Sequence, residues 1–585
     1  MFAHTARGDE EGWDEGFEPP PPFEITGAHI GDVKPATSAA PAHAAGSRIV
    51  AIDGGALVID ADSGNLLRTD RGGALTGQLP ISVEAGLMVY DEVARRAYIA
   101  DRLGDRIIAV NVGEKLAIAA TWKTPAEPYG VALAADRKTL LVTTIADRAL
   151  AAYDVTRGAE MWRTPLGAEP RGVAISPDGT RAVIAMLATG TLEQVALDDR
   201  RLVRRVSLPV DTEGQRARGA FAVAFVGSTA VAPYQLEIPI AKNPDASGQY
   251  GGSFTPPIVH GVGFLAADGR QASGRTSVHE PRALAWDRAR DVLYVAGLAT
   301  DELVAIPKAS QVDIGEGQPA NLRQRCGADG IAIAADGAVL VWCSFTRSVA
   351  RFDLTKHGGL AKVAKGPQLV ASKLDKTHHE GLVLFHTANA HISGFGGMSC
   401  GNCHLDGRAD GLSWKIGTHA LQTPVLAGRV AGTEPFKWDG GAKDLSHSLK
   451  ATIGRLGGSG LSKKQLASLT GYVETMPAIR TPTRSAEAVA RGKKLFESEQ
   501  TGCTSCHDGP AYTDREQHEL VGAKGAFDTP SLRALAASAP YFHDGSAATL
   551  ATVLRDRGKI HGMSAGATKL SEAELSDLIA FLETL

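Results

Sequence analysis

Two copies of the pattern Cys-x-x-Cys-His hold the clearest chemistry in this sequence of 585 residues. They are Cys400, Cys403 and His404 in the first copy, and Cys503, Cys506 and His507 in the second. In this pattern two thiols add to the vinyl groups of a haem and the adjacent histidine reaches the iron, so all three must lie within one helical turn. A zinc site made from two Cys-x-x-Cys pairs would leave both histidines without a role. The sequence therefore predicts two covalently bound haem c groups, with His404 and His507 as proximal ligands.

Candidates for the sixth ligand of each iron lie in glycine-containing segments. For the second haem these are His561 and Met563, in the loop before the last expected helix. A methionine ligand would raise the reduction potential relative to two histidines, and we favour Met563. For the first haem the candidate is His419. The alternative for each of the three is an ordinary solvent-facing residue.

The two motifs open halves whose matching points lie about 105 residues apart. Thr423-Pro-Val-Leu matches Thr529-Pro-Ser-Leu, and Pro435-Phe-Lys-Trp-Asp-Gly matches Pro540-Tyr-Phe-His-Asp-Gly. Each half ends in an amphipathic helix announced by a capping box, in which a serine and a Gln or Glu three residues later satisfy exposed backbone donors. These pairs are Ser462 with Gln465 and Ser571 with Glu574. We therefore expect an all-α dihaem module made of two duplicated cytochrome c units, at residues 380–480 and 485–585.

The sequence before this module predicts short β-strands. Glu127-Pro-Tyr-Gly-Val-Ala and Glu169-Pro-Arg-Gly-Val-Ala open two copies of a repeat of about 42 residues. Glu280-Pro-Arg-Ala and, more loosely, Ala328-Asp-Gly-Ile open two more. This period is typical of the four-stranded blades of a β-propeller. We predict an all-β propeller of about seven blades at residues 47–375, after a disordered Pro/Ala-rich leader at 1–46.

Composition limits the partners and the compartment. The formal net charge of −4 gives no reason to expect nucleic acid or an anionic membrane surface. No apolar run is long enough to span a bilayer, and no signal-peptide pattern opens the chain. Because haem c is attached outside the bacterial inner membrane, we expect an exported, periplasmic protein whose signal peptide is absent from this sequence. The remaining cysteines, Cys326 and Cys343, flank a hairpin-like stretch and are either a disulfide or two buried thiols.

Two known families share these motifs. The repeat core Pro170 to Gly179 resembles YVTN-type propellers, which implies a scaffold or docking surface. Residues 380–585 resemble bacterial dihaem cytochrome c peroxidases and their MauG-type relatives. The strings that carry this resemblance are Leu384 to Cys400, Phe436-Lys-Trp438-Asp-Gly, Thr529-Pro-Ser-Leu-Arg and Ala539-Pro-Tyr-Phe-His-Asp-Gly to Leu550.

The resemblance implies roles for individual residues. The haem on His507 would accept electrons, Trp438 would relay them, and the haem on His404 would meet hydrogen peroxide. His419 lies near the family's displaceable histidine ligand. Calcium, which the family often holds between its haem domains, stays open because no carboxylate-rich loop stands out.

The sequence departs from the family in two places. The peroxidases have a glutamate that moves protons after the Trp-Asp-Gly string, and no glutamate lies between Trp438 and Ser462 here. A positioned proton donor contributes about 10² to 10⁴ in rate, and Arg455 and His447 are the possible substitutes. The tyrosine ligand of the MauG branch also has no counterpart, because no tyrosine follows Tyr541.

Three functions compete on these grounds. The leading hypothesis is a peroxidase-type oxidoreductase that passes electrons from a small cytochrome c or cupredoxin to hydrogen peroxide. The second, motivated by the missing glutamate, is a non-catalytic electron-transfer cytochrome whose propeller docks a redox partner. The third is a MauG-like oxidation of a protein or substrate held on the propeller, for which Gln235 to Gly274, with Tyr250 and His260, is the only motivating feature.

Four histidines before the first haem are interpreted as a polar junction between domains, with a metal site as the alternative. They are His378, His379, His386 and His391.

Overall fold

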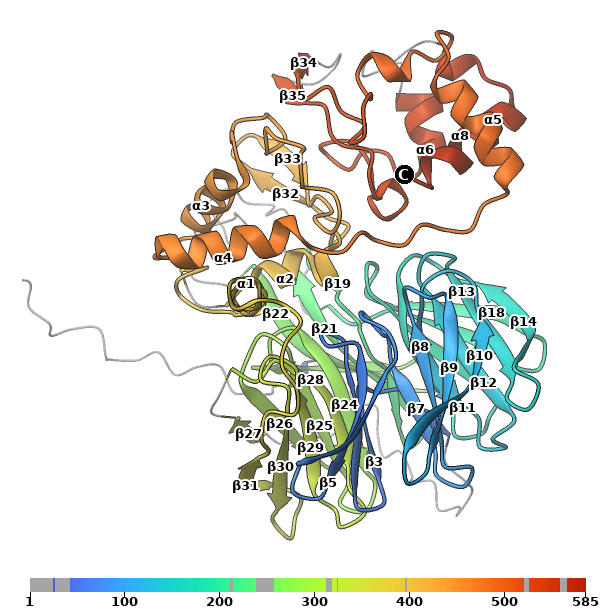
Figure 1. Ribbon diagram of the computed structural model, residues 1–585, viewed down its shortest axis with the longest axis vertical. Coiled ribbons are helices and arrows are strands. Elements are labelled where there is room, and N and C mark those ends of the chain that lie inside the picture. The colour runs from blue at the N-terminus through green and yellow to red at the C-terminus, as the bar shows by residue number, and fades with distance from the viewer. Residues whose placement is uncertain are drawn as a thin grey trace, which may run out of the picture.

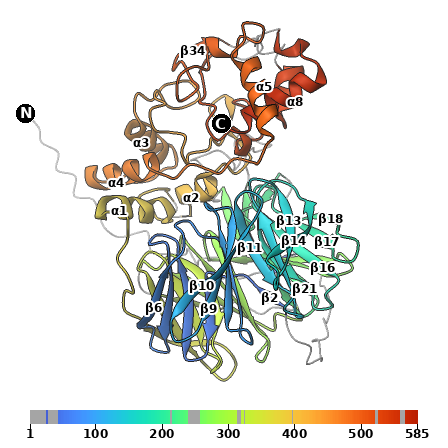
Figure 2. The ribbon, with the colours of Figure 1, turned by 45° about the vertical axis from the view of Figure 1, so that its right-hand side comes forward.

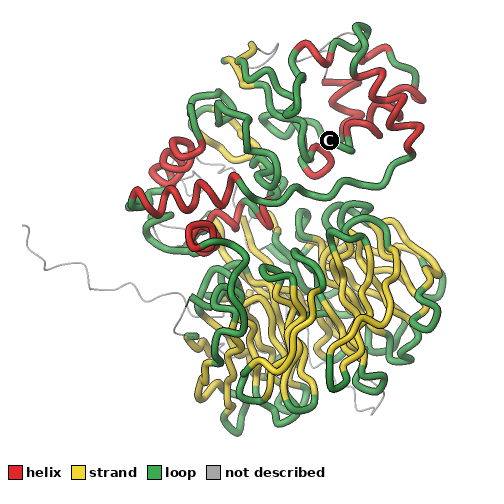
Figure 3. The backbone as a smooth tube through the Cα atoms, in the orientation of Figure 1, coloured by secondary structure: helices red, strands yellow, loops and turns green. Residues whose placement is uncertain are grey.

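The computed structural model describes residues 25–26, 43–210, 214–237, 257–311, 318–322, 325–394, 397–519, 525–557 and 566–585. A ring of β-sheets forms one body, and a helical region lies against one end of it (Figures 1 and 2). Strands and helices are almost completely segregated between the two (Figure 3). The leader expected at 1–46, and Tyr250, His561 and Met563, lie mostly or wholly outside the described residues. None of the described helices has the length and apolarity needed to cross a membrane.

Seven of the nine antiparallel sheets among the described residues form the blades of a propeller, which confirms the prediction of about seven blades. The first three blades are β3 (Ile49–Ile52), β4 (Gly55–Asp60), β5 (Asn65–Asp70) and β6 (Leu75–Pro80); β7 (Met88–Asp91), β8 (Arg96–Asp101), β9 (Arg106–Val112) and β10 (Leu116–Lys123); and β11 (Pro128–Leu133), β12 (Thr139–Thr144), β13 (Ala149–Asp154) and β14 (Ala159–Pro165), with β2 (Ala44–Ala45) added to β11. The fourth and fifth are β15 (Pro170–Ile175), β16 (Arg181–Met186), β17 (Thr191–Ala196) and β18 (Arg201–Ser207); and β19 (Arg216–Arg218), β20 (Ala224–Val226), β21 (Thr229–Glu237), β22 (Ile258–Leu265) and β23 (Gln271–Thr276), with β1 (Ile25–Thr26) added to β23. The last two are β24 (Pro281–Asp287), β25 (Val292–Gly297), β26 (Glu302–Pro307) and β27 (Gln318–Asn321); and β28 (Ala328–Ile333), β29 (Val339–Cys343), β30 (Ser348–Leu354) and β31 (Leu360–Lys365).

The repeats found in the sequence form the innermost strands of the ring. Strand β11 contacts β7 and β15 of its neighbours, and β28 contacts both β24 and β3, which closes the ring between the last and first blades. Both β11 and β15 are buried along their whole length, because each blade covers its neighbour with apolar side chains. The glutamate before each repeat has a left-handed backbone, with φ of 61° at Glu127, 63° at Glu169 and 46° at Glu280. The same turn therefore places these three side chains at the same end of the propeller.

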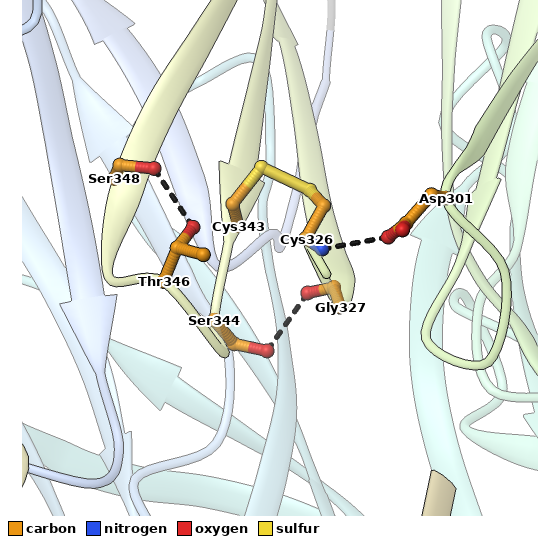
Figure 4. The surroundings of a disulfide bond; sticks show 7 residues. All are labelled: Asp301, Cys326, Gly327, Cys343, Ser344, Thr346 and Ser348. Carbon is orange, nitrogen blue, oxygen red and sulfur yellow. Dashed lines mark hydrogen bonds between the residues drawn. A yellow bond between two sulfur atoms is a disulfide. The ribbon is translucent and has the colours of Figure 1, made fainter. Parts of the chain in front are cut away.

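A disulfide joins Cys326 and Cys343, which decides between the two alternatives left by the sequence (Figure 4). Cys326 lies just before β28 and Cys343 ends β29, so the bond links the two strands at one edge of the seventh blade. The amide of Cys326 donates to Asp301 Oδ1 at 2.6 Å, which attaches this edge to the sixth blade.

The helical region follows the propeller. Its first half comprises α1 (Lys376–His386), α2 (Cys400–Cys403), the 3₁₀ turn η1 (Leu405–Gly407), β32 (Ser413–Ile416), β33 (His419–Gln422), α3 (Leu445–Arg455) and α4 (Lys463–Glu474). Its second half comprises α5 (Ala486–Phe496), η2 (Cys503–Ser505), β34 (Gln517–Glu519), β35 (Ala526–Asp528), η3 (Leu535–Ala537), α6 (Leu550–Thr552), η4 (Val553–Arg557), η5 (Ala567–Lys569) and α8 (Glu572–Leu582). The region is mainly helical as expected, and the described part of each half contains a two-stranded sheet in addition. In the first, Ile416 pairs with His419 across a turn at Gly417, whose φ of 59° suits glycine.

Corresponding helices pack in the same way in both halves. Helix α1 crosses α4, and α5 crosses α8. Each crossing contains a glycine: a Cβ on Gly381 would lie 2.1 Å from the Ser468 carbonyl oxygen, and one on Gly492 would lie 1.9 Å from that of Asp577. Both predicted capping boxes are present, at the starts of α4 and α8. Only glycine allows the backbones to approach this closely.

Candidate haem sites

The second Cys-x-x-Cys-His motif opens onto a large apolar cavity. Its volume is about 590 Å³, within the range of cofactor pockets. Cys503, Cys506 and His507 line it, together with residues of β35, α6 and α8. The apolar and aromatic lining includes Phe527, Tyr541, Phe542 and Leu582. A flat apolar group attached through the two thiols fits this arrangement.

The imidazole of His507 is oriented as a metal ligand requires. Its Nδ1 lies 3.0 Å from the Tyr512 carbonyl oxygen, and since a carbonyl only accepts, Nδ1 carries the proton. Burial lowers the pKa of His507, which favours the neutral ring. Its Nε2 lone pair is therefore the one available to an iron, as in most histidine-ligated metal sites.

The first motif repeats this arrangement. His404 Nδ1 lies 3.0 Å from the Pro424 carbonyl oxygen, and burial lowers the pKa of His404 to about 4. Cys400 and Cys403 lie on α2, whose N-cap Ser399 forms a capping box with the fully buried Asn402. The residues around Cys403 form an apolar cluster with Met398, Leu412 and Trp414. Both motifs thus present two cysteines and one neutral, oriented histidine.

The propeller forms part of the surroundings of the first motif. Gln235 Nε2 donates to the Asn402 carbonyl oxygen at 2.6 Å, and Asn402 Nδ2 donates back to Gln235 Oε1 at 3.2 Å. Ile258 packs into the apolar cluster around Cys403. Ser399 Oγ donates to the buried carboxylate of Glu280. These contacts hold α2 against the fifth and sixth blades.

A buried charge network fixes the turn after His404 to the centre of the propeller. Asp406 accepts from Arg282 at 2.7 Å, and Arg408 donates to Glu127 at 2.6 Å and to Glu169 at 2.7 Å. Burial alone would raise the pKa of Glu127, but Arg408 and Arg102 lower it overall. The glutamates of the repeats therefore contact the haem region, a role that the sequence analysis did not assign to them.

The four histidines before the first haem make separate contacts. His386 Nδ1 lies 2.8 Å from Glu280 Oε2, and His379 Nε2 lies 3.0 Å from the Phe345 carbonyl oxygen, so these two join the helical region to the propeller as interpreted. His378 bonds instead to Asp375 and His391 to Ser459. Across the described ranges, the group of side chains close enough to share a metal ion is Cys506, Asp514 and His518. It includes a haem-attachment cysteine.

Trp438 and His419 both lie toward the second cavity. Trp438 comes from the first half but lines the cavity of the second, and its Nε1 donates to the Gln422 carbonyl oxygen at 2.9 Å. The ring of His419 lies 6.1 Å from that of Phe527, which also lines the second cavity. Gln422 is in β33 and continues directly into Thr423 and Pro424, whose carbonyl accepts from His404. Strand β33 thus connects Trp438 with the proximal side of the first site.

Comparison with known proteins agrees with this geometry. The cytochrome c family matches residues 489–585 and implies covalently bound haem c. The gamma subunit of hydrazine synthase from Kuenenia stuttgartiensis is 27% identical over 256 residues, covering 32% of this chain and 72% of the relative. MauG from Methylophilus methylotrophus is 26% identical over 262 residues, covering 33% and 78%. Cytochrome c551 peroxidase from Nitrosomonas europaea is 26% identical over 270 residues, covering 35% and 78%.

These relatives support a general oxidoreductase character for this chain. The chain thus matches the cytochrome c family over residues 489–585, is similar to MauG and cytochrome c551 peroxidase, and has in addition an N-terminal seven-bladed β-propeller.

Proposed function

We propose that the chain is a periplasmic dihaem oxidoreductase of the peroxidase type. It would take electrons one at a time from a small cytochrome c or cupredoxin and deliver them to hydrogen peroxide. A haem c group supplies one-electron redox chemistry when bound, tuned by its axial ligands and surroundings. The two cytochrome c units, 380–480 and 485–585, would each hold one haem, and residues 47–375 would form the propeller. The matched helix crossings at Gly381 and Gly492 support this duplication.

A continuous path between the two sites is the observation that carries the proposal. It starts at Trp438 in the wall of the second cavity and crosses the hydrogen bond from Trp438 Nε1 to Gln422. It then follows the backbone through Thr423 to Pro424, whose carbonyl oxygen is bonded to His404 Nδ1. Only two hydrogen bonds and three residues of backbone separate the Trp438 indole from the proximal histidine of the first site. We therefore assign Trp438 as the relay, with electrons arriving at the haem on His507.

The sixth ligands belong to the same proposal. By resemblance, His419 is our candidate for the displaceable ligand of the first haem, although its ring lies beside Phe527 of the second cavity. Met563, with His561 as the alternative, is our candidate for the second haem. The haem on His404 would then be the one that opens to peroxide after half-reduction.

The experiment uses the holoprotein made with the c-type maturation machinery. Optical and EPR spectra of the oxidised and half-reduced forms are recorded before and after addition of hydrogen peroxide. We expect half-reduction to produce a high-spin haem that consumes peroxide. Trp438→Phe should slow electron transfer between the haems, whereas Trp162→Phe on the outer strand β14 should not. Unchanged transfer in Trp438→Phe would remove Trp438 from the proposal.

A non-catalytic electron-transfer protein is the second candidate. It is favoured by the absence of a glutamate between Trp438 and Ser462, where the peroxidases have their proton donor. It predicts two low-spin haems that do not react with peroxide in either redox state, and the same spectra distinguish the two functions.

A further inference from the structure

The turn that contains Trp438 has the same conformation in both halves. Lys437 and Phe542 both have a left-handed backbone, with φ of 76° and 68°. Each lies next to a backbone bridge, from Phe436 to Ala442 in the first half and from Tyr541 to Ala547 in the second. Lys437 therefore occupies the position in the first half that Phe542 occupies in the second.

The helix after this turn corresponds as well. Asp444 caps α3 and Thr549 caps α6, which aligns Ser448 with Val553. In the second half both Phe542 and Val553 line the haem cavity. Lys437 and Ser448 stand at the equivalent places of the first half, so a polar pair replaces an apolar pair.

Lys437 forms a chain of hydrogen bonds with residues of helix α3. Its Nζ donates to Thr452 Oγ1 at 2.6 Å, and Thr452 Oγ1 donates to the Ser448 carbonyl oxygen at 3.0 Å. The charge of Lys437 acts on His404, where it contributes to the lowered pKa of that ring. Phe436, the residue before Lys437, packs against the same apolar cluster as Cys400, so this turn lies beside the first motif.

The ammonium group lacks a carboxylate partner. Within the described ranges no Asp or Glu oxygen forms an ion pair with Lys437, and its bond to Thr452 is to a neutral hydroxyl. Burial lowers the pKa of Lys437 to about 8, and the nearby cation of Arg455 adds to this effect, whereas the charge of Asp439 opposes it. A poorly solvated cation without a directly bonded carboxylate gains stability from an anion placed beside it.

We propose that Lys437 holds a small anion at the open face of the first haem by a charged hydrogen bond. The inference rests on the proposed function and names its ligand class, which includes the deprotonated form of hydrogen peroxide. Lys437 would act as a positioning residue, because it would hold the anion beside the first haem. It would not replace the proton-moving glutamate of the peroxidases. The second haem, with Phe542 at the same position, would not bind anions in this way.

The test is azide binding to the half-reduced holoprotein, followed by the Soret band and by EPR. Lys437→Met should raise the azide dissociation constant at least tenfold, because a hydrogen bond to a charged group contributes about 1.5–3 kcal/mol. Lys437→Arg should keep the affinity within about threefold. The matched control is Lys450→Met, which removes an exposed lysine from helix α3, the helix that carries Thr452, and should change nothing. Carbon monoxide, a neutral ligand, should bind the reduced wild type and Lys437→Met equally.

Equal azide affinity in the wild type and Lys437→Met would overturn the inference, as would a wild type that binds no azide in the half-reduced state. A parallel loss of carbon monoxide binding would show a damaged pocket and count against a charge effect. Lys437→Gln, which keeps a donor for Thr452, serves if Lys437→Met does not take up haem. Lys437-dependent azide binding without peroxide consumption would sustain this inference and refute the peroxidase. Peroxide consumption with azide binding that does not depend on Lys437 would support the peroxidase and refute this inference.

Discussion

Gly492→Ala should destabilise the second cytochrome unit strongly for so small a change. The added Cβ would lie 1.9 Å from the Asp577 carbonyl oxygen and 2.8 Å from Phe581 Cβ, so α5 and α8 must move apart by more than about 1 Å. Overpacking of this kind costs about 1–3 kcal/mol, and rigid backbone contact puts the cost near the upper end. Alanine recovers about 1 kcal/mol of helix propensity over glycine. The expected net loss is about 2 kcal/mol, which lowers the melting temperature of a unit of this size by about 8–16 °C.

The assay is thermal unfolding of the holoprotein, monitored by circular dichroism at 222 nm and by the Soret band. Gly454→Ala is the matched control, because Gly454 is an exposed glycine of α3 with nothing within 4 Å of its added Cβ. That variant should gain up to about 1 kcal/mol from helix propensity alone. A lower melting temperature for Gly492→Ala and a higher one for Gly454→Ala would support the close crossing of α5 and α8. If Gly492→Ala melted within about 2 °C of the wild type, the crossing as described would be wrong.

Three further outcomes can be measured. Replacing Cys326 and Cys343 by serine should cost about 3 kcal/mol of unfolding free energy, since the disulfide closes a loop with a sequence separation of 17; an unchanged denaturant midpoint in reducing and oxidising buffer would show that the bond contributes nothing. Arg408→Met should cost about 3–5 kcal/mol, because Glu127 and Glu169 lose a buried partner, whereas Arg201→Met on the surface of β18 should cost under about 1 kcal/mol. Burial and the neighbouring Asp410 raise the pKa of Glu237, so ionisation of this side chain destabilises the folded protein, and the stability of the wild type should fall as the pH rises above the ordinary pKa of Glu. Glu237→Gln should therefore stabilise the protein more at pH 8 than at pH 5. An equal gain in stability at both pH values would contradict this direction.

The propeller was predictable because its repeats are local. Glu127, Glu169 and Glu280 each precede an inner strand and each adopts the same left-handed turn, so one period in the sequence becomes one blade. The fifth blade was harder, since the stretch from Gln235 to Gly274 breaks the repeat. The capping boxes were equally local and were found where the sequence placed them.

The surroundings of the first site depend on contacts between distant segments. Gln235 and Ile258 reach α2 from the fifth blade, and no pattern in either segment indicates that approach. Lys437 lies inside a string that the sequence analysis quoted, but its position became meaningful only when Phe542 was seen in the wall of the second cavity. The small sheet β32–β33 was missed because a four-residue strand carries too little periodicity to distinguish it from a loop.

A ring of seven similar blades offers seven nearly equivalent rotational settings to anything that rests on its end. The turn from Asp406 to Arg408 removes this degeneracy, because it pairs with charges of the third, fourth and sixth blades and with no symmetric set. The helical region therefore has one azimuth about the propeller axis. A redox protein bound to the rim of any particular blade would therefore meet the haem sites at the same distance and angle in every molecule. The propeller would then determine the orientation of the partner as well as support the helical region.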